Sequence, residues 1–383
     1  MKSPPDSEQE LREEYNPAER NLLVTTVTVA ATYVYFLAFA QFGFLRAVET
    51  VMGGQHALLR PIMAVMGAAG IGGSVLMAVI FDERRCRGQL MAGFVIAGAA
   101  AGLAWTAKTP AWFFLCAALT GAGTGMVTVG LAGVLRREVG GGRLGLCIGV
   151  GTGVAYAVCN LPPVFTGGAH TQAMLGVVAA CTGLLAVQFF EQRAPRQNAR
   201  GYDYSPGGKV LWTGMFFALV WLDSAAFQII QHTPALKSVT WSGGPQLLVI
   251  AGAHLVAGVL AGIALDRRRV AGATLTATVL LLAAGILIVT GRGSLGAPLY
   301  AAGVSAYSSV LVFYPARSSR VALAAGVFGV AGWAGSALGI VAADTWAAGP
   351  HWFLLIAIGV VPVLLGWRAR HGRPGARSAR NVQ

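Results

Sequence analysis

Two ionisable residues lie inside long apolar segments of this sequence, where a charge is costly. Asp223 belongs to a run that begins at Val210, and His254 belongs to the next apolar run. An acid inside a membrane costs about 3 kcal/mol on insertion scales, so it normally faces a cavity and has a partner. A carboxylate and an imidazole that reach water can carry a proton. We therefore predict that Asp223 and His254 form a proton-coupling pair. The alternative is structural: an Asp bonded within its own helix and a His that completes a helix contact.

The depths of the two residues agree if both runs are membrane-spanning helices. Asp223 lies 13 residues from Val210, and His254 lies eight residues from Gln246. At about 1.5 Å per residue, these positions are about 20 Å and about 12 Å from opposite faces. In a hydrocarbon layer about 30 Å thick, the two side chains would share one level.

The composition indicates a membrane protein. The chain has 383 residues, a mean hydropathy of +0.64 and only 11% charged residues. A soluble domain of this size needs a more polar surface, and the alternating pattern of a transmembrane β-barrel does not occur. A helix of about 20 apolar residues spans the hydrocarbon layer. We predict an all-α integral membrane protein with twelve transmembrane helices, at 21–45, 61–81, 90–107, 110–135, 145–166, 173–191, 210–231, 246–265, 273–290, 296–316, 321–343 and 352–367.

The basic residues are distributed unevenly. With twelve spans, 23 of the 28 Lys and Arg residues fall in segments on one side of the membrane. The positive-inside rule then predicts a protein of the cell (inner or plasma) membrane with both termini cytoplasmic. The net charge of +13 therefore favours contact of the basic tail 368–383 with lipid head groups over binding of nucleic acid. Residues 1–20 carry six acids, so we expect no cleavable signal peptide there.

A weak internal repeat divides the chain. The basic turns after the second and eighth spans hold Asp82 and Asp266, 184 residues apart, and FLAFAQF (36–42) precedes WLDSAAF (221–227) by 185 residues. A recurring offset indicates duplication, and parallel halves place a solute site between them. The predicted divisions are a cytoplasmic tail (1–20), a six-helix bundle (21–191), a cytoplasmic linker (192–209), a second six-helix bundle (210–367) and a basic cytoplasmic tail (368–383).

One of these turns resembles a family signature. GIALDRRR, from Gly262 to Arg269, resembles the G-x-x-x-D-R motif of the major facilitator superfamily. The first-half copy AVIFDERRCRG is similar, with Ala78 for the leading glycine and Glu83 for the following arginine. The resemblance implies two pseudo-symmetric six-helix bundles with a cavity lined by spans one, four, seven and ten. The solute contacts expected on this architecture are Tyr33, Gln41, Gln228 and Tyr307, with Asn160 of the fifth span as a further candidate.

The basic turns also have a physical interpretation of their own. An Asp at a helix end, followed by arginines, can pair with a neighbouring helix end or its dipole. Breaking such a pair would favour rearrangement of the two halves. The predicted gating residues are Asp82, Arg84, Arg85, Gly262, Asp266 and Arg267. The alternative is that the arginines only fix the topology.

Other chemistry has no support in the sequence. The five cysteines form no CxxC or Cys/His ligand spacing, and no nucleophile is paired with a base. Glycine runs such as GAGTGM lack the lysine of a phosphate loop and lie in apolar spans, where small residues let helices approach closely. We expect no enzyme activity, no metal site and no cofactor.

The predicted function is transport. The spans contain no deep Lys or Arg, so an anionic substrate is disfavoured. We expect a secondary active transporter that moves a small neutral, amphipathic or weakly cationic solute by alternating access, coupled to protons through Asp223. Two alternatives remain open: an uncoupled uniporter, and a non-transporting membrane protein of the same fold that serves assembly or sensing. A monomer is expected, because one chain holds both halves.

Overall fold

The computed structural model describes residues 17–53, 56–190, 202–241 and 243–346, together with Val363 and Gly366. These residues form helices and no strands. Ten of their helices are long and apolar enough to cross a membrane, and Leu144–Cys159 is a shorter apolar helix.

Several predicted segments lie outside the described residues. They are the predicted twelfth span (352–367, apart from two residues), the tail 368–383, nearly all of the tail 1–20 and the first part of the linker 192–209.

The part of the chain before the linker, here called the first half, follows the predicted spans closely. Its helices are α2 (Pro17–Val34), η1 (Tyr35–Gly43), α3 (Phe44–Met52), α4 (His56–Ile80), α5 (Cys86–Thr106), α6 (Pro110–Val139), α7 (Leu144–Cys159), α8 (Pro162–Phe165) and α9 (Ala169–Val187). The first three form one continuous rod, which ends where Gly53 takes the left-handed backbone conformation (φ 54°) that glycine tolerates.

The part after the linker, the second half, has a matching series. Its helices are α10 (Pro206–His232), α11 (Pro234–Thr240), α12 (Gly244–Asp266), α13 (Val270–Val289), α14 (Gly293–Ser318), α15 (Val321–Gly326), η2 (Val327–Ala334) and α16 (Gly335–Trp346). The segments η1 and η2 are π-helices, in which the backbone is wound more widely than in an α-helix.

The predicted fifth span (145–166) is too long at its end. Helix α7 stops at Cys159, and the short helix α8 starts at Pro162. Prolines 162 and 163 have no N–H to continue the hydrogen-bond ladder, so the chain turns before them. The Asn160 side chain closes α7 by donating from Nδ2 to the Tyr156 carbonyl at 2.9 Å.

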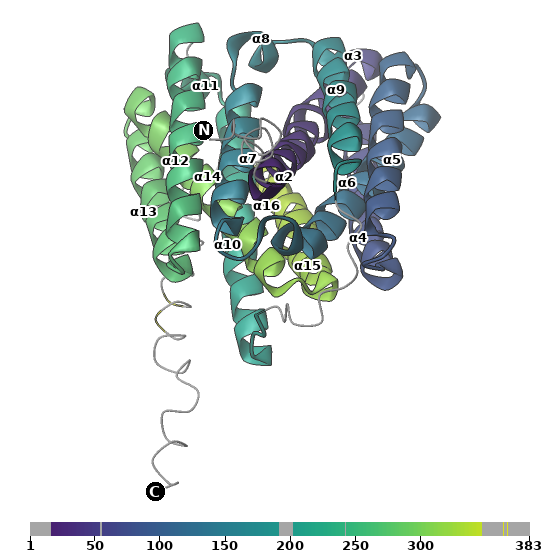
Figure 1. Ribbon diagram of the computed structural model, residues 1–383. Coiled ribbons are helices and arrows are strands. Elements are labelled where there is room, and N and C mark those ends of the chain that lie inside the picture. The colour runs from purple at the N-terminus through teal and green to yellow at the C-terminus, as the bar shows by residue number, and fades with distance from the viewer. Residues whose placement is uncertain are drawn as a thin grey trace, which may run out of the picture.

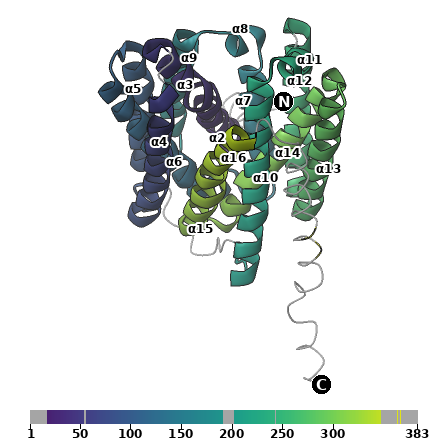
Figure 2. The ribbon, with the colours of Figure 1, turned by 180° about the vertical axis from the view of Figure 1, so that it is seen from behind.

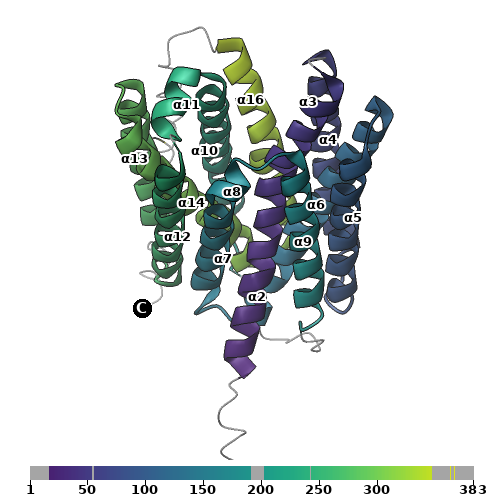
Figure 3. The same cartoon turned by 90° about the horizontal axis from the view of Figure 1, so that it is seen from above.

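The two halves lie side by side, with α4, α5, α6 and α9 on one side and α12, α13 and α14 on the other (Figures 1 and 3). They meet along two lines: α7 packs on α12, and α4 packs on α15 and η2. Figure 2 shows α15 and α16 between α4 and α10. The repeat relates the second span to the eighth and the fifth to the eleventh, so the two lines of contact are equivalent under it.

Glycines allow the α7–α12 contact. A Cβ added at Gly262 would lie 2.5 Å from the Gly145 carbonyl oxygen, and one added at Gly258 would lie 2.5 Å from that of Gly149. Real side chains do not approach so closely, so the two backbones touch along one face of each helix. This is the small-residue packing expected of membrane helices, and it explains the glycine-rich sequence of α7.

Both ends of the bundle are bridged between halves. At the end that carries Arg84, Arg143 and Arg267, here called the basic end, the Arg136 side chain donates to the Arg317 carbonyl at 2.9 Å. At the opposite end, Arg60 of α4 is 3.4 Å from Asp344 of α16. The structure therefore holds the two halves together on both sides of the central layer.

Candidate functional site

Asp223 lies in the middle of α10 and faces α14. The hydroxyls of Tyr300 and Tyr307 each donate to one of its carboxylate oxygens, and Tyr300 also contacts the Asp223 carbonyl at 3.2 Å. The two tyrosines are seven residues apart on α14, about two helical turns, so both rings project from one face toward the same carboxylate. Both tyrosines are buried, whereas Asp223 keeps part of its surface accessible.

The carboxylate has no cationic partner among the described residues. Its two oxygens are bonded to tyrosine hydroxyls, and no described ion pair includes Asp223. Every described Lys and Arg lies in a loop or within about two turns of a helix end. An ionised Asp223 is therefore an uncompensated charge in the central layer, which is expensive unless a proton or a ligand neutralises it.

The predicted pairing of His254 with Asp223 is wrong. His254 is buried on α12, its Nδ1 is 2.7 Å from the Ser305 hydroxyl, and its ring stacks on Tyr156 at 4.7 Å between centroids. Sequence position set the depth of the two residues but left the rotation of each helix about its axis undetermined. That rotation turns His254 toward α7 and α14, and Asp223 toward Tyr300 and Tyr307.

Helix α14 connects these groups to the first half. The hydroxyl of Ser308 is 3.0 Å from that of Tyr156, and Ser309 is 3.0 Å from Thr152, with both partners on α7. Tyr307, which bonds Asp223, is the neighbour of Ser308 in sequence. Within three consecutive residues of α14, Tyr307 bonds Asp223, and Ser308 and Ser309 bond helix α7 of the first half.

The predicted solute contacts are dispersed. Tyr33 is buried in α2, and Gln41 is half-buried in η1. Asn160 closes the end of α7, as described above. Gln228 lies toward the opposite end, where its amide donates to Asp344 at 3.2 Å. Of the predicted contacts, only Tyr307 bonds Asp223.

Sequence reasoning missed Tyr300 and Tyr156. Tyr300 was detectable, because its spacing of seven residues from Tyr307 puts both on one helix face. Tyr156 carried no comparable signal, since its role depends on the packing of α7 against two helices of the second half.

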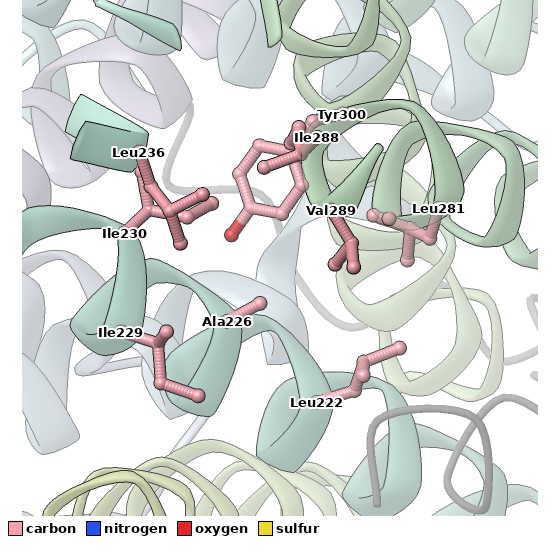
Figure 4. A pocket seen from close by; sticks show the side chains of 10 residues that line it. Leu222, Ala226, Ile229, Ile230, Leu236, Leu281, Ile288, Val289 and Tyr300 are labelled. Atoms are coloured by element: carbon pink, nitrogen blue, oxygen red, sulfur yellow. The ribbon is translucent and has the colours of Figure 1, made fainter. Parts of the chain in front are cut away.

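An apolar hollow of about 50 Å³ adjoins this site. It lies between α10, α11, α13 and α14, and Figure 4 shows the Tyr300 ring beside Ile288 and Leu236 on its wall. The Tyr300 hydroxyl is the one polar side-chain group that lines it. The hollow is therefore unsuited to a polar solute, although the same Tyr300 hydroxyl bonds Asp223.

The two predicted gating turns differ in what they bind. Asp266 accepts hydrogen bonds from the backbone N–H groups of Gly145 (2.6 Å) and Leu146 (2.9 Å), in the first turn of α7. Helix α7 has no side-chain cap of its own, so an acid of the second half caps a helix of the first half.

Asp82, the repeat counterpart of Asp266, acts within its own turn. It accepts from the Arg84 backbone N–H at 2.9 Å and lies 3.9 Å from the Arg85 side chain. The Arg267 backbone N–H bonds the Ile263 carbonyl of its own helix at 3.2 Å. The cross-half contact of these turns is thus made by Asp266 and by Gly262, which touches Gly145.

The arrangement of the helices places the chain among known membrane proteins. No family model and no curated protein sequence matches it. The structure is similar to that of the human organic anion transporter MFSD10 (TETRAN), with a TM-score of 0.65 and 16% identity over 92% of this chain and 99% of that one. It is also similar to the proton:xylose symporter XylE of the major facilitator superfamily, in a structure bound to 6-bromo-6-deoxy-D-glucose. The TM-score to XylE is 0.68, with 12% identity over 94% of this chain and 97% of that one.

The chain therefore has the fold of major facilitator superfamily transporters, and it is a multi-pass membrane protein. This confirms the all-α membrane fold and the resemblance found in the sequence. The count of twelve spans stays a prediction, because the last one lies outside the described residues.

Proposed function

We propose that the protein is a secondary active transporter that moves a small neutral, amphipathic or weakly cationic solute by alternating access, coupled to protons through Asp223. The observation that carries the proposal is the setting of Asp223: a half-buried residue in the central layer whose carboxylate is bonded to two tyrosine hydroxyls, without a cationic partner in the described part of the chain. The fold, shared with two solved transporters, supports the same conclusion.

A proton would change the hydrogen bonds of Asp223. An ionised carboxylate only accepts, whereas a carboxylic acid also donates. Protonation therefore removes the charge that strengthens both tyrosine hydrogen bonds and adds a donor to the site. Tyr307 is adjacent to Ser308, which bonds Tyr156 of the first half at 3.0 Å. Through this neighbour, the protonation state of Asp223 would bias the contact between the halves.

Solute contact is proposed for residues near this carboxylate. Tyr307 bonds Asp223, Tyr33 is buried in α2, and Gln41 lies farther along in η1. Asn160 and Gln228 would contact solute only after exchanging their present bonds to Tyr156 and Asp344. His254 is proposed to support the site through its stack on Tyr156, as a second protonatable group in the network.

The remaining parts of the proposal concern topology. The basic end faces the cytoplasm of a cell (inner or plasma) membrane, with both termini on that side and the two bundles divided at the linker. The strong bias of Lys and Arg toward one set of loops supports this orientation. A monomer suffices, because the site lies between elements of one chain. Gating is proposed for Asp82, Arg84, Arg85, Gly262, Asp266 and Arg267.

The test is proton movement in proteoliposomes. A panel of candidate solutes is added outside, and a pH dye trapped inside reports proton flux for the wild type and Asp223→Asn. Glu49→Gln is the matched control, because it makes the same acid-to-amide change at an exposed site on α3. We expect solute-dependent proton flux in the wild type and the control, and its loss in Asp223→Asn with folding intact.

The rival functions give different results. A uniporter moves labelled solute with no proton flux, and Asp223→Asn changes only its affinity. A non-transporting protein moves no solute, and the same variant folds and behaves as the wild type. Proton flux that survives in Asp223→Asn would refute the assignment of this residue as the coupling acid.

A further inference from the structure

We infer that the coupled solute is a monovalent organic cation, and that it exchanges with a proton on the carboxylate of Asp223. The inference rests on the proposed function and narrows it in two respects. It commits to a cationic solute among the three solute classes left open, and it commits to exchange over co-transport.

The charge of the site favours a cationic solute. Asp223 is a carboxylate without a cationic partner among the described residues, and its partners are two neutral hydroxyls. Two hydroxyl donors stabilise the ionised form but leave its net charge in place. A ligand with one positive charge would remove that charge, whereas an anion would double it. The site is thus complementary to a cation. An organic anion would instead require a cationic side chain within reach.

The carboxylate also has unused acceptor positions for such a ligand. An ionised carboxylate offers about four acceptor positions, and each oxygen of Asp223 uses one of them for a tyrosine. Part of the Asp223 surface remains accessible, although both tyrosines are buried. An ammonium group at the carboxylate could therefore bond to it without displacing either tyrosine.

The surroundings favour an organic cation over a metal ion. Tyr300 packs edge to face on Trp241 (6.5 Å), Trp241 on Phe227 (5.4 Å), and Phe227 stands one turn beyond Asp223 on α10. Aromatic rings attract ammonium groups and cover their apolar substituents. A divalent metal ion instead takes six or more oxygen ligands, and no cluster of three or more His, Cys, Asp or Glu side chains occurs in the described part of the chain.

Exchange follows because a proton and a cation cannot occupy Asp223 at the same time. A proton on Asp223 neutralises the same charge that would hold the cation, and no second acid of the described central layer can take over either role. Protonated Asp223 plus a cation therefore becomes the ionised Asp223–cation pair plus one proton, which is released to water. Charge balances in this step, and one cation moves against one proton.

The experiment measures binding and proton release together in purified, detergent-solubilised protein. The probes are a size series of cations: methylammonium, tetramethylammonium, choline, tetraethylammonium and tetraphenylphosphonium. The uncharged carbon isostere of choline, 3,3-dimethylbutan-1-ol, and benzoate as an anion are the controls. Calorimetry gives affinity, and a pH indicator in weak buffer counts protons, for the wild type, Asp223→Asn and Glu49→Gln.

We expect at least one cation of the series to bind and to release up to one proton per cation. Its apparent affinity should weaken by up to about tenfold for each unit that the pH falls, because proton and cation exclude one another. Asp223→Asn should lose both the binding and the proton release, and Glu49→Gln should keep them. If Asp223→Asn does not fold, Tyr307→Phe gives the same test with a weakened carboxylate site.

Three results would overturn the inference. The first is that none of the cations causes proton release. The second is that a cation binds with the same affinity at every pH. The third is that the isostere or benzoate binds and the protein takes up a proton. The last of these, combined with solute-driven proton flux in proteoliposomes, would leave the proposed proton-coupled transport standing with a different solute class.

Discussion

Phe42 and Phe227 pack edge to face across the interface of the two halves, with ring centroids 5.2 Å apart. They are 185 residues apart, the same offset that aligns FLAFAQF with WLDSAAF. Residues at equivalent positions of the repeat therefore meet each other on the axis that relates the halves. The pair stands between Asp223, one turn away on α10, and the opposite end of the bundle.

Removing this aromatic contact should open the opposite end. Phe42→Ala and Phe227→Ala each delete a pair contribution of about 0.5–1.5 kcal/mol, so the closed arrangement should lose up to about tenfold in population. The measurement is alkylation of a cysteine placed at Ala226. Phe189→Ala, an exposed aromatic residue at the other side of the protein, should leave the alkylation rate unchanged. Equal rates in all variants would show that the pair does not control access.

The tyrosine hydroxyls should set the pH at which the transporter works. Hydrogen bonds to a charged group are worth about 1.5–3 kcal/mol, so Tyr307→Phe or Tyr300→Phe makes the ionised form of Asp223 less favourable. The pH profile of solute-driven proton flux should then move to higher pH by about one unit or more. Tyr314→Phe is the control, because this α14 tyrosine bonds the Gly208 carbonyl at the basic end. A profile that stays in place would exclude a role for the hydroxyls in coupling.

The two repeat-related acids should have unequal effects on the basic end. Asp266→Ala removes two charge-assisted bonds between the halves, whereas Asp82→Ala removes bonds within one turn. We expect faster maleimide labelling of Cys147, which is buried on α7 beside the Asp266 contact, in Asp266→Ala alone. Mass spectrometry of the labelled peptide gives the rate. Similar rates in the two variants would contradict a cross-half role for Asp266.

Close backbone contact at Gly262 should make it intolerant of a side chain. A methyl group there meets the Gly145 carbonyl oxygen at 2.5 Å, so Gly262→Ala should destabilise the protein by about 1–3 kcal/mol. Gly252→Ala on the same helix is the control, because nothing lies within 4 Å of its added methyl group. Thermal unfolding in detergent gives the comparison. Unchanged unfolding of Gly262→Ala would mean that the helices can separate without loss.

The sequence predicted the fold well because hydrophobic length is a direct signal. A run such as 273–290 needs no partner to be recognised as a span, and α13 covers nearly the same residues. The end of the fifth span was less accurate, since a window of apolar residues continues through Leu161 while two prolines break the helix. The twofold relation was also visible, in the offset that later proved to join Phe42 and Phe227.

The site was predicted only in part, because it depends on the rotation of each helix. Asp223 stood out by its cost in an apolar run, and it is the centre of the polar network. Its true partners come from a helix 77 and 84 residues further along the chain, and depth alone could not separate them from His254. Gln228, five residues after Asp223, points about 140° away from it around α10 and lies nearer the opposite end, where it binds Asp344.

The cap of α7 has a consequence for water. Because Asp266 supplies the acceptors for Gly145 and Leu146, separation of the halves at the basic end leaves two backbone N–H groups without partners. An unpartnered N–H in an apolar medium costs several kcal/mol, so hydration of this helix start must accompany the opening. The two related acids therefore differ in what their loss would expose: Asp266 leaves a helix start of the other half to water, whereas Asp82 affects only its own turn.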